Sequence, residues 1–298
     1  MAHGHSHGAA DYNRAFALGV LLNLAYVVAE VWFGLMAHSL ALVADAGHNL
    51  SDVLSLLLAW GANRLSQSRP STRFTYGLRS SSILASLANA IILLIAIGAI
   101  GWEAIRRFHQ PQSVPGSTVM AVAAVGVIIN TATALLFMKG RKTDINVKAA
   151  FLHMAADAGV SLGVVISGFA IQRSGLLWID PLTTLLIVAV IAFGTLGLLR
   201  ESMNLALQAV PTGIDIGQVR QYLGGLPHVI AVHDLHVWPM STTETALTVH
   251  LVRSIDSCDP VLLQRACDEL HERFRIEHVT IQFETEDHDC QLAPEKTV

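Results

Sequence analysis

Two pairs of residues with the same spacing stand inside long apolar stretches of this chain. His48 and Asp52 lie in ALVADAGHNLSDVLSLLLAW, and His153 and Asp157 lie in FLHMAADAGVSLGVVISGFA. A spacing of four places both side chains of a pair on one face of a helix, one turn apart. Two such helices can bring two imidazoles and two carboxylates to one point, and this donor set suits a four-coordinate zinc-like ion.

The apolar surroundings argue against a mere packing role for these four residues. An aspartate at the centre of a membrane helix costs about 2.5 to 3.5 kcal/mol on insertion scales, so it is expected to pair with another group or to serve a function. One buried histidine is usually a packed residue, but two matched pairs in two helices are difficult to explain by packing. We therefore predict that His48, Asp52, His153 and Asp157 bind a metal ion inside the membrane.

Two further polar residues accompany the first pair. Asp45 lies one helical turn before His48, and Asn49 follows His48 directly. We predict that Asp45 supports the ligands or takes part in proton transfer, the alternative being that it simply lies near the membrane surface. Asn49 is predicted to orient a ligand, as residues around metal ligands often do.

Composition indicates that the helices carrying these residues cross a membrane. Of 298 residues, 52% are hydrophobic and only 14% are charged, whereas soluble domains carry about 25% charged residues. A helix needs about 20 apolar residues to cross the bilayer. Stretches of this kind predict six spans, at residues 15–36, 40–65, 80–105, 118–138, 149–171 and 182–199.

The distribution of basic residues orients these six spans. The segments 63–79 and 139–148 together with Arg14 hold nine Lys and Arg residues, and the opposite loops hold three. The positive-inside rule therefore places both termini in the cytoplasm, and we expect the inner (plasma) membrane. The net charge of −4 gives no basic footprint for nucleic acid. The three cysteines form no CxxC pair, which fits a reducing compartment.

The chain divides into four predicted parts. Residues 1–14 are predicted to be a flexible tail whose His3, His5 and His7 either collect metal or are merely solvated. Residues 15–208 form the membrane domain, 209–285 a cytosolic domain, and 286–298 a disordered tail. The cytosolic domain is predicted to be α+β, because its helical and strand patterns follow the order α-β-β-α-β of a truncated ferredoxin-like fold.

The cytosolic domain offers a second set of candidate ligands. His233 and His236 lie on its first predicted strand, His250 on the second and Glu284 on the third. Neighbouring strands can bring these side chains together, which predicts a regulatory metal site. The alternative is that they are scattered surface residues.

Several sequence blocks together resemble the cation diffusion facilitator family, in particular its zinc-transporting branch. The blocks are SLALVADAGHNLSDVLSLLLAW, RFTYGLRSSSILASLANA, FLHMAADAGVSLGVV, WIDPLTTLLIV and VHDLHVW, in the family's order, and the resemblance covers about residues 10 to 285. One departure is Ser82, which stands where many members have a glutamate.

The resemblance implies a homodimer that exports Zn²⁺, with Cd²⁺ or Co²⁺ as further substrates, from the cytoplasm in exchange for protons. It implies that the four intramembrane residues form the transport site, and that the cytosolic domain dimerises and binds Zn²⁺ through His233, His250 and Glu284, with His236 nearby. Alternating access by rocking of the helices is the expected mechanism. Two rival interpretations are a membrane metalloenzyme, which needs an open coordination position and a general base, and a metal sensor.

Overall fold

The computed structural model describes residues 9–66, 68–138, 145–254 and 260–285. The chain forms two compact units. One comprises the residues up to Leu57 together with Asn89–Gly197, and the other comprises Leu58–Ala88 together with the residues from Leu198 onward. His3, His5 and His7 of the predicted N-terminal tail and the predicted C-terminal tail at 286–298 lie outside the described residues.

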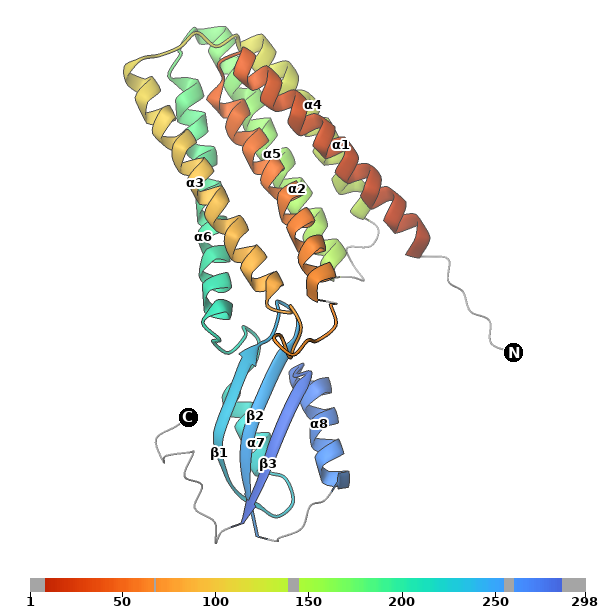
Figure 1. Ribbon diagram of the computed structural model, residues 1–298. Coiled ribbons are helices and arrows are strands. Elements are labelled where there is room, and N and C mark those ends of the chain that lie inside the picture. Colours follow the sequence, from red (N-terminus) through yellow and green to blue (C-terminus); the bar gives the residue numbers. More distant parts are fainter. Residues whose placement is uncertain (1–8, 67, 139–144, 255–259, 286–298) are drawn as a thin grey trace, which may run out of the picture. The chain divides into compact units, whose positions relative to one another are not determined.

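Within the described residues, long helices stand at all six predicted positions (Figure 1). They are α1 (Ala9–Met36), α2 (Leu40–Ser66), α3 (Ser81–His109), α4 (Gly116–Phe137), α5 (Ile145–Ser174) and α6 (Ile179–Ala206). Most of their ends lie within a few residues of the prediction. Helix α1 is an exception, because it begins at Ala9 inside the predicted flexible tail. Its first turn contains two alanines, which are the best helix formers.

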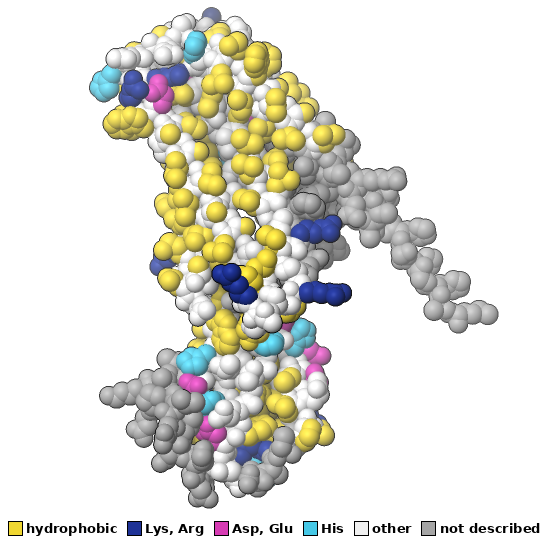
Figure 2. All heavy atoms as spheres, viewed as in Figure 1, with side chains coloured by type: hydrophobic (Ala, Val, Ile, Leu, Met, Phe, Trp, Pro, Cys, Tyr) yellow, Lys and Arg dark blue, Asp and Glu magenta, His cyan; other side chains and the backbone are white. Residues whose placement is uncertain are grey.

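Four of these helices are long and apolar enough to cross a membrane, by a search limited to the described residues. They are Ser81–His109, Gly116–Leu136, Phe151–Ser174 and Ile179–Ala206. Helix α1 contributes a shorter apolar stretch, Asn23–Met36, and α2 contains the polar residues of the first candidate pair. Many large apolar side chains of the helices are exposed, such as Phe193, Ile95 and Ile128. Figure 2 shows hydrophobic side chains spread over the visible face of the helices. Such a surface fits contact with lipid.

The helical unit is held by an apolar cluster and by close backbone approaches. Buried residues of α2 to α6 and of the α3–α4 link form one core: Ala41, Leu42, Ala44, Ile97, Val114, Val119, Ala123, Val164, Ile171, Ile187 and Ile191. Helices α4 and α5 approach each other closely at two glycines. A Cβ on Gly116 would lie 2.4 Å from the carbonyl oxygen of Gly168, and one on Gly168 would lie 2.8 Å from that of Gly116. Small residues allow this packing between membrane helices, and it fixes α5, which carries the second candidate pair.

The C-terminal domain consists of two helices and a three-stranded sheet. Its elements are α7 (Ile216–Gly224), β1 (Val229–Pro239), β2 (Thr245–Arg253), α8 (Pro260–Phe274) and β3 (His278–Thr285). This confirms the predicted order α-β-β-α-β. Asp215 caps α7, because its side chain accepts hydrogen bonds from the backbone N–H groups of Gly217 and Gln218.

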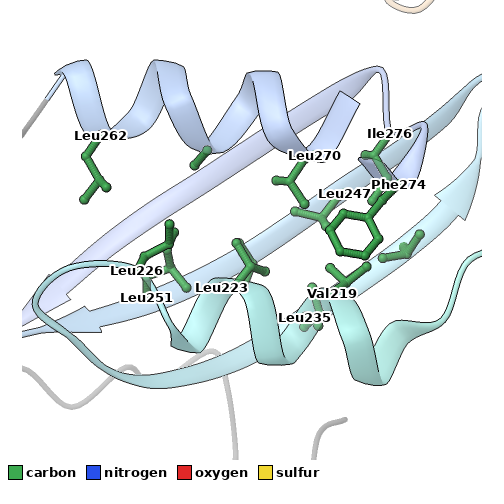
Figure 3. Packing of buried hydrophobic residues seen from close by; sticks show 13 residues of the cluster. Val219, Leu223, Leu226, Leu235, Leu247, Leu251, Leu262, Leu270, Phe274 and Ile276 are labelled. Atoms are coloured by element: carbon green, nitrogen blue, oxygen red, sulfur yellow. The ribbon is translucent and has the colours of Figure 1, made fainter. Parts of the chain in front are cut away.

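One face of this sheet packs against both helices. Figure 3 shows the core, which includes Val219 and Leu223 of α7, Leu235 of β1, Leu247 and Leu251 of β2 and Leu270 of α8. Because successive side chains of a strand point to opposite faces, the residues between these apolar positions lie on the other face of the sheet. The candidate ligands of the domain are among them.

The strand order is β1-β2-β3. Strands β1 and β2 are antiparallel, and β2 and β3 are parallel and directly hydrogen-bonded. In a complete ferredoxin-like sheet, helix-connected parallel strands are separated by another strand. Here β2 and β3 pair directly. The structure therefore shows an α/β domain with a three-stranded sheet, and it does not confirm the predicted ferredoxin-like arrangement.

Candidate metal centre

The four intramembrane candidates meet between α2 and α5. The Nε2 atom of His48 lies 3.3 Å from Oδ1 of Asp157, and the Nε2 atom of His153 lies 3.2 Å from Oδ2 of Asp52. Each imidazole thus faces the carboxylate of the other helix. His153 Nε2 also lies 3.8 Å from Oδ2 of Asp157 on its own helix. We refer to these four residues as the membrane tetrad.

The tetrad offers two nitrogen and two oxygen donors. Ligand atoms of His48, Asp52 and Asp157 all lie within 4.8 Å of one another, and His153 adjoins these three through its contacts with Asp52 and Asp157. The rings of His48 and His153 are 6.2 Å apart and nearly perpendicular. A divalent ion of the zinc group takes four donors of these types at about 2.0 to 2.2 Å, so His153 has to move inward to complete the coordination.

Burial differs strongly across the tetrad. The side chain of Asp157 is 2% exposed and that of His48 is 20% exposed, whereas Asp52 and His153 are 29% and 44% exposed. The open side of the tetrad is therefore the side of Asp52 and His153. Asp52 lies one turn nearer the end of α2 than His48, and His153 lies one turn nearer the beginning of α5 than Asp157, so the open side is the one toward the basic segments 63–79 and 139–148.

Asp45 and Asn49 belong to a second buried polar group rather than to the tetrad's immediate partners. Asp45 is 0% exposed, which excludes a position at the surface of the helical unit, and its Oδ2 accepts a hydrogen bond of 2.9 Å from Ser161. Asn49 donates its side-chain N–H to Oε2 of Glu30 at 3.4 Å. The predicted use of Asn49 to orient a ligand therefore has no support in its contacts. Glu30 also accepts a hydrogen bond of 2.7 Å from the hydroxyl of Tyr26.

A third buried acid positions α2 itself. Asp180, at the start of α6, accepts a hydrogen bond of 2.5 Å from the hydroxyl of Ser39 and bonds of 2.9 and 3.4 Å from the backbone N–H groups of Leu40 and Ala41. It thus satisfies the free N–H groups at the beginning of α2 and places a negative charge at the positive end of the helix dipole. Sequence reasoning gave Asp180 no role, because a cap supplied from a residue so distant in the chain has no local pattern.

The candidate ligands of the C-terminal domain lie on the face of the sheet away from its core. His233 pairs with His250, but His236 pairs with Thr248, so β1 contains one residue more than β2 in this region. The extra residue forms a β-bulge, where Asp234 has a positive φ of 51°. In a regular strand His233 and His236 would point to opposite faces; the bulge places both on the outer face.

Three of these residues form a cluster of possible ligands, His233, His250 and Glu284, which we call the sheet cluster. Glu284 Oε2 lies 2.8 Å from Nε2 of His233, and Oε1 lies 3.0 Å from Nδ1 of His250. His236 stands beside the cluster and contacts Asp234 at 2.9 Å, while Asp234 lies 3.6 Å from His250. Histidine and acidic side chains are also visible together on this domain in Figure 2.

Ser82 takes part in contacts that do not need a carboxylate. Its hydroxyl donates to the carbonyl oxygen of Arg79 and accepts from the backbone N–H of Thr242, both at 3.1 Å. Arg79 in turn forms an ion pair of 3.0 Å with Glu244. The segment before α3 is therefore joined to the β1–β2 turn.

Comparisons with known proteins identify the family of this chain. The family model described as the cation efflux transmembrane domain matches residues 16–205, and the one described as the cation efflux protein, cytoplasmic domain, matches residues 211–286. The chain belongs to the cation efflux family. As a member of this family, which is the cation diffusion facilitator family of the sequence resemblance, it is a divalent-cation efflux transporter rather than an enzyme.

Relatives in the cation efflux family match nearly the whole chain. A zinc transporter, ZitB, of Pectobacterium atrosepticum is 32% identical over 95% of this chain and 89% of its own length. A cadmium, cobalt and zinc/H⁺-K⁺ antiporter of Bacillus subtilis is 29% identical over 98% of this chain and 97% of its own. A solved structure of the metal-bound C-terminal domain of CzcD from Cupriavidus metallidurans is 36% identical, with a TM-score of 0.22, and covers 24% of this chain and 99% of that domain.

Proposed function

We propose that this protein exports Zn²⁺, and with it Cd²⁺ or Co²⁺, from the cytoplasm in exchange for protons, using the membrane tetrad as its transport site. The observation that carries the proposal is the crosswise contact of two imidazoles with two carboxylates from separate helices. Borderline-soft divalent ions accept this mixture of nitrogen and oxygen donors, whereas Mg²⁺ and Ca²⁺ favour oxygen alone. The names of the relatives, a zinc transporter and a cadmium, cobalt and zinc antiporter, support the same ions.

The exchange with protons follows from the chemistry of the ligands. Imidazole and carboxylate must be deprotonated to hold a metal ion, so binding releases protons and release of the metal takes protons back. An unperturbed imidazole has a pKa of about 6.5, which allows this exchange near neutral pH. His48 and His153 thus have two roles in the proposal, as ligands and as carriers of protons. The His153 side of the tetrad is the entry from the cytoplasm, and rocking of the helices then opens the site to the other side.

The proposal includes six membrane spans with both termini in the cytoplasm of the inner membrane. Helices α1 and α2 are 28 and 27 residues long, which exceeds the roughly 20 residues that a span requires. The lower hydropathy of α2 is expected, because Asp45 and the first pair of the tetrad face other helices rather than lipid. The excess of Lys and Arg in the segments 63–79 and 139–148 supports the orientation.

We further propose that the C-terminal domain dimerises two copies of the chain and binds regulatory Zn²⁺ through the sheet cluster. The match to a cytoplasmic-domain model of the family supports this assignment. The domain is proposed to be a ferredoxin-like fold without its first strand. Removing that strand from the centre of the sheet leaves the two helix-connected strands free to pair directly, as β2 and β3 do.

Metal uptake into inverted membrane vesicles under an imposed pH gradient tests the proposed function. The vesicles are given Zn²⁺, Cd²⁺, Co²⁺, Mn²⁺ or Mg²⁺, with an interior more acidic than the medium. We expect uptake of Zn²⁺ and its chemical neighbours that stops when an ionophore collapses the gradient. Vesicles that accumulate no metal beyond a protein-free control, or that accumulate it equally without the gradient, would contradict proton-coupled export.

A further inference from the structure

Two buried carboxyl groups outside the tetrad lie close together between α1 and α2. Glu30 and Asp45 are both 0% exposed. Asn49, one turn after Asp45 on α2, donates to Glu30 of α1, which brings the two acids to the same part of the α1–α2 interface. Each also has its own neutral donors. Glu30 accepts from Tyr26 and Asn49, and Oδ2 of Asp45 accepts from Ser161. The remaining oxygen of Asp45, Oδ1, is buried and has no hydrogen-bond donor among the described residues.

The membrane parts of the surrounding helices supply no lysine or arginine to this carboxyl pair. The segments 15–36, 40–63, 116–137 and 149–172, which cover the membrane parts of α1, α2, α4 and α5, contain no lysine or arginine. The titratable groups that bear on the pair are Tyr26 on α1, His48 on α2 and Asp157 on α5. Helix α4, the part of α3 from 81 to 102 and the part of α6 from 181 to 199 contain no titratable side chain.

Two adjacent carboxylates buried without a cation repel each other and lose their hydration, so one of them holds a proton. A proton on Glu30 supplies the donor that Oδ1 of Asp45 otherwise lacks. The pair then carries a single charge, distributed over hydrogen bonds from Tyr26, Asn49 and Ser161. This arrangement resembles catalytic carboxylate dyads, in which two like charges in contact do not both ionise.

The position of the pair links it to the tetrad. Asp45 lies one turn before His48 on α2 and interacts electrostatically with His48 and Asp157. A divalent ion in the tetrad adds two positive charges close to Asp45. That field stabilises the ionised form of both carboxyl groups, and it favours loss of the shared proton. Departure of the ion reverses this effect.

We propose that Glu30 and Asp45 form a proton-binding site, separate from the metal ligands, that loses its proton when a divalent ion enters the tetrad and regains it when the ion leaves. This inference rests on the proposed function. It adds to the exchange one proton that is bound by Glu30 and Asp45 and not by a metal ligand. Tyr26, Asn49 and Ser161 are positioning residues, because they hold the two carboxyl groups in place without exchanging a proton. The proton site is then empty when the metal site is filled, and filled when the metal site is empty. Antiport requires this alternation.

The test uses the full-length protein in proteoliposomes with two transport assays. One measures accumulation of Zn²⁺ driven by a pH gradient, and the other measures exchange of labelled for unlabelled Zn²⁺ at equal pH, which needs no net proton movement. For Glu30→Gln we expect exchange to continue, because the tetrad is unchanged. We expect gradient-driven accumulation to fall by about 10-fold, within the usual range for coupling between two binding equilibria.

Proton release on Zn²⁺ binding provides a second readout. Purified Glu30→Gln protein is expected to release about one proton fewer per chain than the wild type at the same pH, because metal binding displaces protons from every linked group. Glu30→Asp keeps a carboxyl group and is expected to restore part of the driven accumulation. Thr133→Val is the matched control, since Thr133 is a buried polar residue of α4 whose hydroxyl donates to the carbonyl oxygen of Ile129 in the same helix.

The outcomes separate this inference from the function on which it rests. Wild-type protein that neither exchanges nor accumulates Zn²⁺ refutes the transport function itself. Driven accumulation and proton release by Glu30→Gln equal to wild type refute the proton site alone. Loss of exchange together with driven accumulation, in a variant that still elutes as folded protein, also refutes it, because Glu30 would then support metal binding. If Glu30→Gln does not fold, Asp45→Asn is judged by the same criteria.

Discussion

The membrane tetrad and the sheet cluster use the same side chains on very different backbones. In the tetrad, each helix supplies a histidine and an aspartate one turn apart, and the contacts run between α2 and α5. In the sheet cluster, three adjacent strands supply one ligand each, and a bulge at Asp234 sets the face on which the first strand's histidines lie. A sheet is a continuous hydrogen-bonded unit, whereas two helices can shift relative to each other.

This difference fits two different tasks. A transport site has to exchange its accessibility between the two sides of the membrane, and ligands divided between two helices permit such a change. A regulatory site has to report the metal concentration, and ligands fixed in one sheet hold an ion without opening to another compartment. The comparison therefore predicts that damage to the tetrad stops transport, and that damage to the sheet cluster changes its control.

Replacing Asp157 tests the first half of the comparison and has the largest expected effect. Asp157 is the most buried member of the tetrad and contacts both histidines. Altering residues that only support metal ligands costs about 10- to 100-fold in affinity, so Asp157→Ala should reduce Zn²⁺ transport in proteoliposomes by at least that factor. His250→Ala serves as the control in the sheet and should leave transport at saturating Zn²⁺ close to wild type. Near-wild-type transport by Asp157→Ala would contradict the site.

Asp234→Val tests the second half. A β-branched residue strongly disfavours the positive φ of Asp234 in the bulge. Valine therefore favours regular alternation in β1, in which His233 and His236, three positions apart, fall on opposite faces of the sheet. In an Asp157→Ala background, where the tetrad is disabled, Zn²⁺ binding by titration calorimetry should weaken by about 10- to 100-fold. Asp234→Gly keeps the bulge, because glycine accepts positive φ readily, and should retain most of the binding. Equal affinities for the valine and the glycine variant would show that the bulge does not position the ligands.

Gly126 offers a test of the packing that holds the buried polar residues beside the tetrad. A Cβ at this position of α4 would lie 2.2 Å from the hydroxyl oxygen of Tyr26 and 3.1 Å from that of Ser161. Gly126→Ala should destabilise the protein by about 1 to 3 kcal/mol, the usual cost of overpacking, as measured by unfolding in detergent. At Gly159 of α5 a Cβ would meet no atom of the described residues within 4 Å, so Gly159→Ala is the control. Equal stability of the two variants would argue against this packing.

The smallest expected effect concerns only the C-terminal domain. The pKa of Asp215 is lowered by hydrogen bonds from the backbone N–H of Gln218, from its side chain and from the backbone N–H of Gly217. A lowered pKa in the folded state means that the stabilisation is present above the unfolded value of about 3.9 and is lost as the pH falls through the folded value. Amide hydrogen exchange at Gly217 and Gln218 should therefore be faster in Asp215→Ala than in wild type at pH 7, after correction for intrinsic rates. This difference should shrink below about pH 4; a difference independent of pH would exclude the ionised cap as its cause.

The two regions also differ in how far the sequence alone predicts them. The residues of the tetrad can be predicted because helical spacing is regular. His48 and Asp52 share one face of their helix, and His153 and Asp157 share one face of theirs, wherever the helices begin. The sheet cluster can be predicted only in part. The alternation of side chains along a strand predicts that His250 and Glu284 lie on the outer face of the sheet. A bulge depends on how two strands pair, so the sequence of β1 alone does not predict that His236 and His233 lie on the same face.

Other contacts depend on tertiary structure from the outset. Glu30 is recognisable as a residue that avoids lipid, but its pairing with Asp45 requires knowledge of which helices meet. Asp180 caps α2 from the beginning of α6, although 141 positions separate it from Ser39. Local sequence patterns contain no information about either partner.

The most direct test of the central claim is an anomalous-scattering map of the protein with Zn²⁺ bound. The account predicts a zinc peak between α2 and α5, with the Nε2 atoms of His48 and His153 and one carboxylate oxygen each of Asp52 and Asp157 at about 2.0 to 2.2 Å. A helical unit whose zinc lies elsewhere, with these four side chains directed away from one another, would contradict the account.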